Sequence, residues 1–101
     1  MQTSLGIKLR EKHPDRIPII FEPKKDLPLL KTKMLIPNDS TIAQVMTILR
    51  KYIELKKCDA IFLFVNDIIP KNTETVGSLY QKYKNDEGLL EIVISKESTF
   101  G

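Results

Sequence analysis

Residues 32–53 read TKMLIPNDSTIAQVMTILRKYI, an alternating segment followed at once by a segment of helical period. In the first part, successive side chains of an extended chain lie on opposite sides: Lys33 and Leu35 on one, Met34 and Ile36 on the other. The second part opens with Thr41 and Gln44, which match the capping box T-x-x-Q that satisfies free N–H groups at a helix start. Apolar residues then recur at helical spacing: Ile42, Val45, Ile48, Leu49, Tyr52 and Ile53. The stretch predicts a strand over 32–37 and then a helix packed on a core.

The flanking segments predict the remaining elements in the order α-β-β-α-β-α-β. They are a short helix over 3–12, a strand over 16–22, a connection over 23–31, a strand over 60–65, a helix over 75–84 and a strand over 89–95. Asn66-Asp67 and residues 85–88 have turn composition. In the last strand we expect Leu90, Ile92 and Ile94 to point inward and Leu89, Glu91 and Val93 outward.

This order predicts an α+β fold in which a hairpin is followed by a crossover helix and two more strands. It resembles the β-grasp of ubiquitin-like domains, with a four-stranded mixed sheet, helices packed on it and a short N-terminal helix. We expect an N-terminal helical segment over 1–15, the β-grasp domain over 16–95 and a conjugation tail over 96–101.

Composition excludes several functional classes. The 101 residues are 42% hydrophobic and 29% charged, ordinary values for one folded domain, and the net charge of +3 is too small to suggest a nucleic-acid partner. Cys58 and His13 are the one cysteine and the one histidine, both beside predicted turns, so we expect no catalytic dyad. No spacing typical of a metal site or a phosphate loop occurs, and no metal or cofactor is expected. The lone cysteine indicates a reducing compartment, and a cytoplasmic location is expected.

The last two residues, Phe100 and Gly101, follow the polar segment SKEST at 95–99. Glycine lacks Cβ, so its peptide unit can enter a channel too narrow for other residues. Its carboxylate is available for activation and transfer to an amine. The ending therefore suggests a conjugation tail, although a terminal glycine without a function is the alternative.

The predicted strand 32–37 has features of a peptide-binding edge. Lys31 and Lys33 lie beside Leu35, and lysines near apolar pockets can attract an acidic peptide that adds a strand to the sheet. The alternative is an edge strand protected by lysines against aggregation.

Read together, six segments resemble GABARAP-type autophagy ubiquitin-like modifiers of the lipid-conjugated branch. They are residues 14–20 (PDRIPII), 33–37 (KMLIP), 50–51 (RK), 62–67 (FLFVND), 79–81 (LYQ) and 97–101 (ESTFG). The resemblance implies that Gly101, preceded by Phe100, is adenylated by an activating enzyme, passed to a conjugating enzyme and joined to phosphatidylethanolamine. A processing or delipidating cysteine protease is a further implied partner. The lipidated form is then expected on autophagosomal or related membranes.

The resemblance also implies two pockets that bind the aromatic-x-x-aliphatic motifs of autophagy receptors. The first, for the aromatic residue, would comprise Leu9, Pro18, Ile20, Lys33, Leu35 and Leu89. The second, for the aliphatic residue, would comprise Met34, Ile36, Pro37, Val45, Ile48 and Tyr52. Arg16 and Lys31 would attract acidic residues that precede the motif. Leu89 replaces an aromatic residue of the family, which indicates a looser first pocket.

Two other interpretations remain open. One is the sister autophagy modifier that is conjugated to a protein lysine, which can carry a Lys-Thr-Lys like residues 31–33. The other is a ubiquitin-like interaction domain whose tail is never conjugated.

Overall fold

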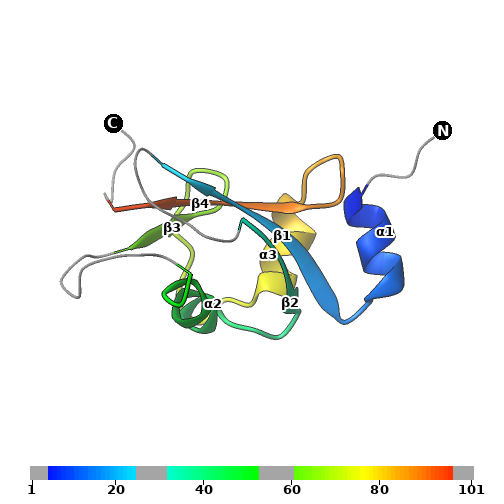
Figure 1. Cartoon of the computed structure of the whole chain (residues 1–101), viewed down its shortest axis with the longest axis horizontal. Helices are drawn as coiled ribbons and strands as arrows, with labels where there is room; N and C mark the ends of the chain where they lie inside the picture. The colour runs from blue at the N-terminus through cyan, green and yellow to red at the C-terminus, as the bar shows by residue number, and fades with distance from the viewer. Residues whose placement is uncertain (1–4, 25–31, 53–60, 97–101) are drawn as a thin grey trace.

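The computed structural model describes residues 5–24, 32–52 and 61–96. Within them lie three helices and four strands, in the order predicted (Figure 1). The helices are α1 (Leu5–Lys12), α2 (Ile42–Leu49) and α3 (Val76–Tyr83). The strands are β1 (Arg16–Pro23), β2 (Lys33–Pro37), β3 (Phe62–Phe64) and β4 (Leu90–Ser95).

The strands form one mixed sheet in the order β2-β1-β4-β3. β1 and β4 are parallel neighbours at its centre, and the antiparallel strands β2 and β3 form its two edges. The predicted α+β class and the four-stranded mixed sheet are confirmed.

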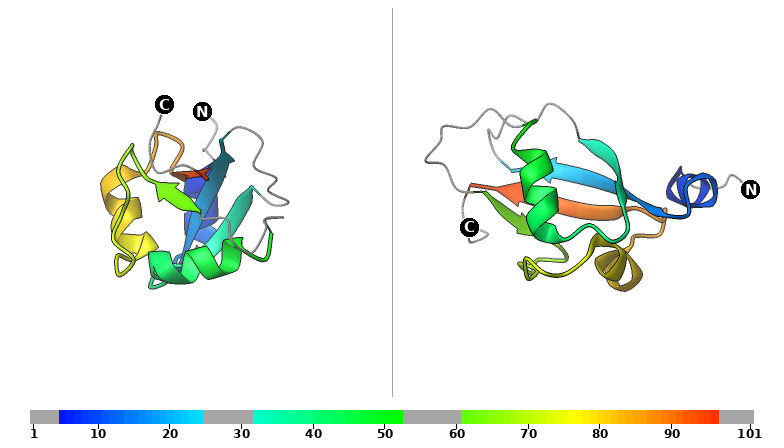
Figure 2. Two further views of the ribbon diagram at one scale, coloured as in Figure 1. Left: turned by 90° about the vertical axis from the view of Figure 1, so that its left-hand side faces the viewer. Right: turned by 90° about the horizontal axis from the view of Figure 1, so that it is seen from below.

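One face of the sheet packs against α2 and α3, which lie on the same side of it (Figure 2). Alternate residues of the two central strands are buried there, including Ile17 and Ile19 of β1 and Leu90 and Ile92 of β4. Val45, from α2, is 0% exposed in the same core. Helical period on α2 and alternation on the strands thus direct apolar side chains to one interior.

The predicted start of α2 is confirmed, but its end is not. The Gln44 backbone N–H donates to Thr41 Oγ1 at 3.3 Å and the Thr41 N–H donates to Gln44 Oε1 at 2.8 Å, which completes the capping box. The helix ends at Leu49, and the chain continues through a turn to Tyr52. Ile53, predicted on the same helical face, lies outside the described residues.

The predicted outward position of Leu89 is wrong. Leu89 is 3% exposed, because it shares a cavity wall with Leu5 and Leu9 of α1 on the face of the sheet opposite the main core. The alternation rule correctly places Leu89 on the other face from Leu90, yet it cannot show that a helix packs over that face.

α1 is held at this end of the sheet by an unusually close backbone approach. A Cβ on Gly6 would come within 2.2 Å of the Gly88 carbonyl oxygen, so only glycine fits there. Gly88 has φ +75° in the turn before β4, a left-handed conformation that glycine adopts readily. The hydroxyl of Tyr80 donates to the same Gly88 oxygen at 2.7 Å. Helix α3, the turn and α1 are therefore packed together around one carbonyl group.

Arg10 adds a second connection between α1 and its surroundings. Its guanidinium donates to the Arg16 carbonyl at 2.9 Å and also to the Pro14 carbonyl, and it lies 5.5 Å from the ring centroid of Tyr80. Burial raises the pKa of the Tyr80 hydroxyl above its ordinary value, and the positive charge of Arg10 opposes this rise.

Candidate peptide-binding site

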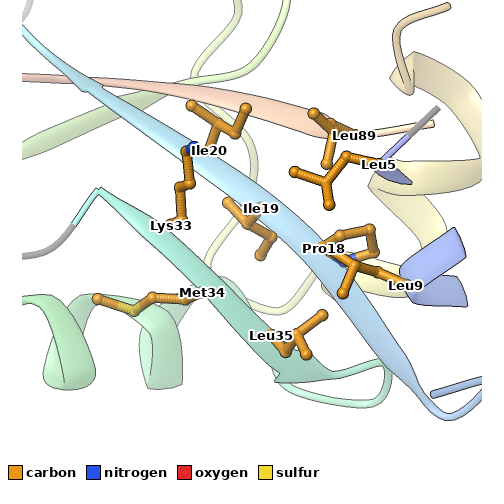
Figure 3. Close-up of a pocket in the computed structure, with 9 residues that line it drawn as sticks. All are labelled: Leu5, Leu9, Pro18, Ile19, Ile20, Lys33, Met34, Leu35 and Leu89. Carbon is orange, nitrogen blue, oxygen red and sulfur yellow. The ribbon is translucent and has the colours of Figure 1, made fainter. Parts of the chain in front are cut away.

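A cavity of about 380 Å³ opens on the sheet face that α1 partly covers (Figure 3). Its walls come from α1, β1, β2 and the residue before β4: Leu5, Leu9, Pro18, Ile19, Ile20, Lys33, Met34, Leu35 and Leu89. Eight of these nine side chains are apolar, and Lys33 supplies the charge. Such a cavity is suited to a large apolar side chain next to an acidic one.

Strand pairing explains why these residues meet. The antiparallel register places Pro18 opposite Leu35 and Ile20 opposite Lys33, so two side chains of each strand share this face. Leu9 lies across from them on α1, and Leu89 precedes β4. All six residues predicted for the first pocket thus line one cavity.

The sequence prediction did not include Leu5, Ile19 and Met34 among the first-pocket residues, although they also line this cavity. A signal for Leu5 existed, because it stands four residues before Leu9 and therefore on the same helical face. Met34 was assigned to the second pocket, and its side chain packs against the main core, so it borders this cavity only from its position on β2 (Figure 3).

The open edge of β2 lies beside this cavity. The Phe21 N–H donates to the Thr32 carbonyl at 2.7 Å, which makes this a hydrogen-bonded pair of the antiparallel ladder. Bonded and non-bonded pairs alternate, so the pairs that contain Lys33 and Leu35 are non-bonded. Pro18, opposite Leu35, has no N–H to donate, which agrees with a non-bonded pair at this position. The backbone N–H and C=O groups of Lys33 and Leu35 consequently point away from β1, toward the open edge.

The residues predicted for the second pocket divide into two groups. Met34, Ile48 and Tyr52 are half-buried and Pro37 is exposed, so these four can contact a ligand. Ile36 and Val45 are 2% and 0% exposed and belong to the main core. They support the surface from below, and in this conformation their side chains are too buried for the ligand contact that the sequence predicted.

The basic residues predicted to attract acidic ones lie along this edge where they are described. Arg16 and Lys33 are exposed, and the Arg16 guanidinium donates to the Leu35 carbonyl over a long 3.4 Å. Lys31, Phe100 and Gly101 lie outside the described residues.

Among the described residues, no group of three His, Cys, Asp or Glu side chains could hold a metal ion. No helix in the described part of the chain is long and apolar enough to cross a bilayer.

The fold and its open edge define a ubiquitin-like domain, and comparison with known proteins gives the family. The family model described as "Autophagy protein Atg8 ubiquitin like" matches residues 3–101. The chain belongs to the Atg8 family, as its resemblance to GABARAP-type modifiers predicted. It is therefore a ubiquitin-like protein of autophagy and not an enzyme.

Individual relatives agree with this assignment. The chain is 42% identical over 97 residues to autophagy-related protein 8e of Arabidopsis thaliana. The alignment covers 93% of this chain and 80% of that protein. The crystal structure of Trypanosoma brucei ATG8 matches with a TM-score of 0.83 and 38% identity, covering 95% of this chain and 85% of that one. Plasmodium falciparum Atg8, solved in complex with a P. falciparum Atg3 peptide, matches with a TM-score of 0.83 and 33% identity over 94% of this chain and 87% of that one.

Proposed function

We propose that this protein is conjugated through Gly101 to phosphatidylethanolamine and recruits autophagy receptors that carry aromatic-x-x-aliphatic motifs. The observation that carries the recruitment step is the combination of an open strand edge with an apolar cavity beside it. Outward N–H and C=O groups of Lys33 and Leu35 can extend the sheet with a peptide strand, while the cavity takes its aromatic side chain. Met34, Ile48 and Tyr52 would take the aliphatic residue.

Charge supports a motif preceded by acidic residues. Lys33 at the cavity and Arg16 at the start of β1 are exposed cations near the same edge. Lys31 would add a third positive charge. Exposed cations of this kind increase the association rate and the specificity for an acidic peptide more than its affinity.

The conjugation step is supported by membership of the Atg8 family, whose model match extends over the Phe-Gly pair at residues 100–101. Partners for this step would be the cognate activating and conjugating enzymes, with a cysteine protease for processing or release. The complex of P. falciparum Atg8 with an Atg3 peptide motivates the same kind of contact here. The free protein would be cytoplasmic and the conjugated form bound to autophagosomal membranes.

Mass spectrometry of the adduct in cells tests the conjugation target. We expect phosphatidylethanolamine on Gly101. A protein lysine on Gly101, without lipid, would establish the sister-modifier alternative. If neither the wild type nor Gly101→Ala forms a thioester with the cognate enzymes and ATP, the chain is an unconjugated interaction domain.

Calorimetry with a motif peptide tests the recruitment step. Replacing Leu35 with Ala removes part of the cavity wall and should weaken binding by about 1–3 kcal/mol. Ile68→Ala is the matched control, because Ile68 is an apolar side chain, 55% exposed, that does not line the cavity. Equal affinities for the two variants would contradict the proposed site.

A further inference from the structure

The cavity beside β2 has a chemical feature that a general apolar pocket need not have. None of the described residues that line it carries an oxygen acceptor in its side chain, and the weakly accepting thioether of Met34 packs against the main core instead (Figure 3). Lys33 is the one polar side chain among them, and its ammonium group only donates. Within the part of the chain that the structure describes, an acceptor for a buried ligand would have to come from the backbone.

The described backbone of the cavity walls does not direct one into the cavity. Carbonyl groups of β1 and β2 lie in the plane of the sheet, not across its face. The Leu9 carbonyl accepts from the His13 N–H at 2.8 Å, and the Leu89 carbonyl accepts from the Asn85 N–H at 2.8 Å. The wall formed by α1 and the start of β4 therefore presents hydrocarbon to the cavity.

Leu5 has a special place in this wall. It is 49% exposed, yet it lines the cavity, and Figure 3 shows it near Leu89 at the end away from Lys33. A ring that enters over the β2 edge would point toward this end. A longer polar side chain at position 5 would bring an acceptor to the place where the tip of the ring arrives.

We propose that the cavity selects an aromatic side chain without an N–H donor, phenylalanine in preference to tryptophan, and that Leu5 determines this preference. The inference rests on the proposed motif-binding function. An indole fills the cavity with more apolar surface, but its N–H loses water and finds no partner among the lining side chains. A phenyl ring has no such group to desolvate.

Three peptides that differ at the aromatic position separate ring size from hydrogen bonding. They carry phenylalanine, tryptophan or 3-benzothienylalanine, which keeps the shape of tryptophan but has sulfur in place of the N–H. On the wild-type protein we expect the benzothienyl peptide to bind more tightly than the tryptophan peptide by about fivefold or more. The phenylalanine peptide should bind at least as tightly as the tryptophan peptide.

Leu5→Glu should reverse the order of the tryptophan and benzothienyl peptides, because its carboxylate can accept from the indole N–H. Ile7→Glu is the matched control: Ile7 is on the same helix and 43% exposed, but it does not line the cavity. Ile7→Glu should keep the wild-type order. Each result is a ratio of two affinities on one protein, so a partial loss of folding cancels.

Equal binding of the tryptophan and benzothienyl peptides to the wild type would overturn the proposed selectivity, as would an identical ratio in Leu5→Glu. Failure of all three peptides to bind the wild type would overturn the proposed function itself. The two failures are therefore distinguishable in one titration series.

Discussion

Replacing Gly6 with Ala tests how α1 is held on the sheet. In an exposed helix this change would stabilise the protein by about 1 kcal/mol, since Ala has the higher helix propensity. Here the new methyl group would lie 2.2 Å from the Gly88 carbonyl oxygen and 2.3 Å from the Glu87 carbonyl oxygen. Both are backbone atoms, so neither can rotate away as a side chain would.

The structure indicates that the steric clash outweighs the gain in helix propensity. To reach ordinary contact, α1 and the turn must separate by about 1 Å, which disturbs the acceptor of the Tyr80 hydroxyl. Leaving that buried hydroxyl unpaired costs about 1–3 kcal/mol. Partial exposure of Leu89 and Leu9 adds a cost on the scale of about 1 kcal/mol. After the propensity gain is subtracted, we expect a net loss of about 2 kcal/mol.

Urea unfolding of the wild type, Gly6→Ala and Lys8→Ala measures this loss, with Lys8 as the exposed control on the same helix. In a Tyr80→Phe background the cost of Gly6→Ala should be smaller, because no hydroxyl is left unpaired. A Gly6→Ala protein as stable as the wild type would refute the close packing. Motif-peptide affinity should fall in Gly6→Ala as well, since Leu5 and Leu9 move with the helix.

Three further perturbations have defined outcomes. Thr41→Ala removes the capping box of α2 and should cost about 1 kcal/mol in urea unfolding, whereas no change would show that the cap is dispensable. Burial raises the pKa of Tyr80, so the folded state keeps a proton that the unfolded chain releases, and stability should fall as pH rises above about 10. Tyr80→Phe should lack this component, and identical pH profiles would contradict it. Ile92→Ala, at 0% exposure in the core, should cost about 2–5 kcal/mol, while Ile69→Ala, at 50% exposure, should stay near the wild type.

Local patterns were sufficient to predict most of the fold. The capping box, the alternation on residues 33–37 and the turn at residues 66–67 depend on nearest neighbours along the chain. Asn66 and Asp67 have positive φ values of 52° and 65°, as a tight turn with these residue types would have. The predicted strand 60–65 is shorter than expected because Val65 already pairs with Ile68 across that turn.

The position of α1 could not be predicted in the same way. It depends on a contact between Gly6 and Gly88, which are far apart in sequence and carry no side chains to form a pattern. Without that contact, Leu89 reads as an outward residue of an alternating strand. The six first-pocket residues came from a family resemblance, and the lack of acceptor groups became visible only when all the walls of the cavity were known.

Under the proposed function, the same contact would give α1 a role in recognition. A helix of eight residues has little stability on its own, so its docked state depends on contacts at Gly6, Arg10 and the cavity wall. A peptide in the cavity touches Leu5 and Leu9 only while α1 is docked. Binding and docking are then thermodynamically linked, and each must favour the other by the same factor. The two proposed pockets would then differ in kind: the residues proposed for the second lie over side chains of the main core, whereas the first exists in full only when the N-terminal helix completes it.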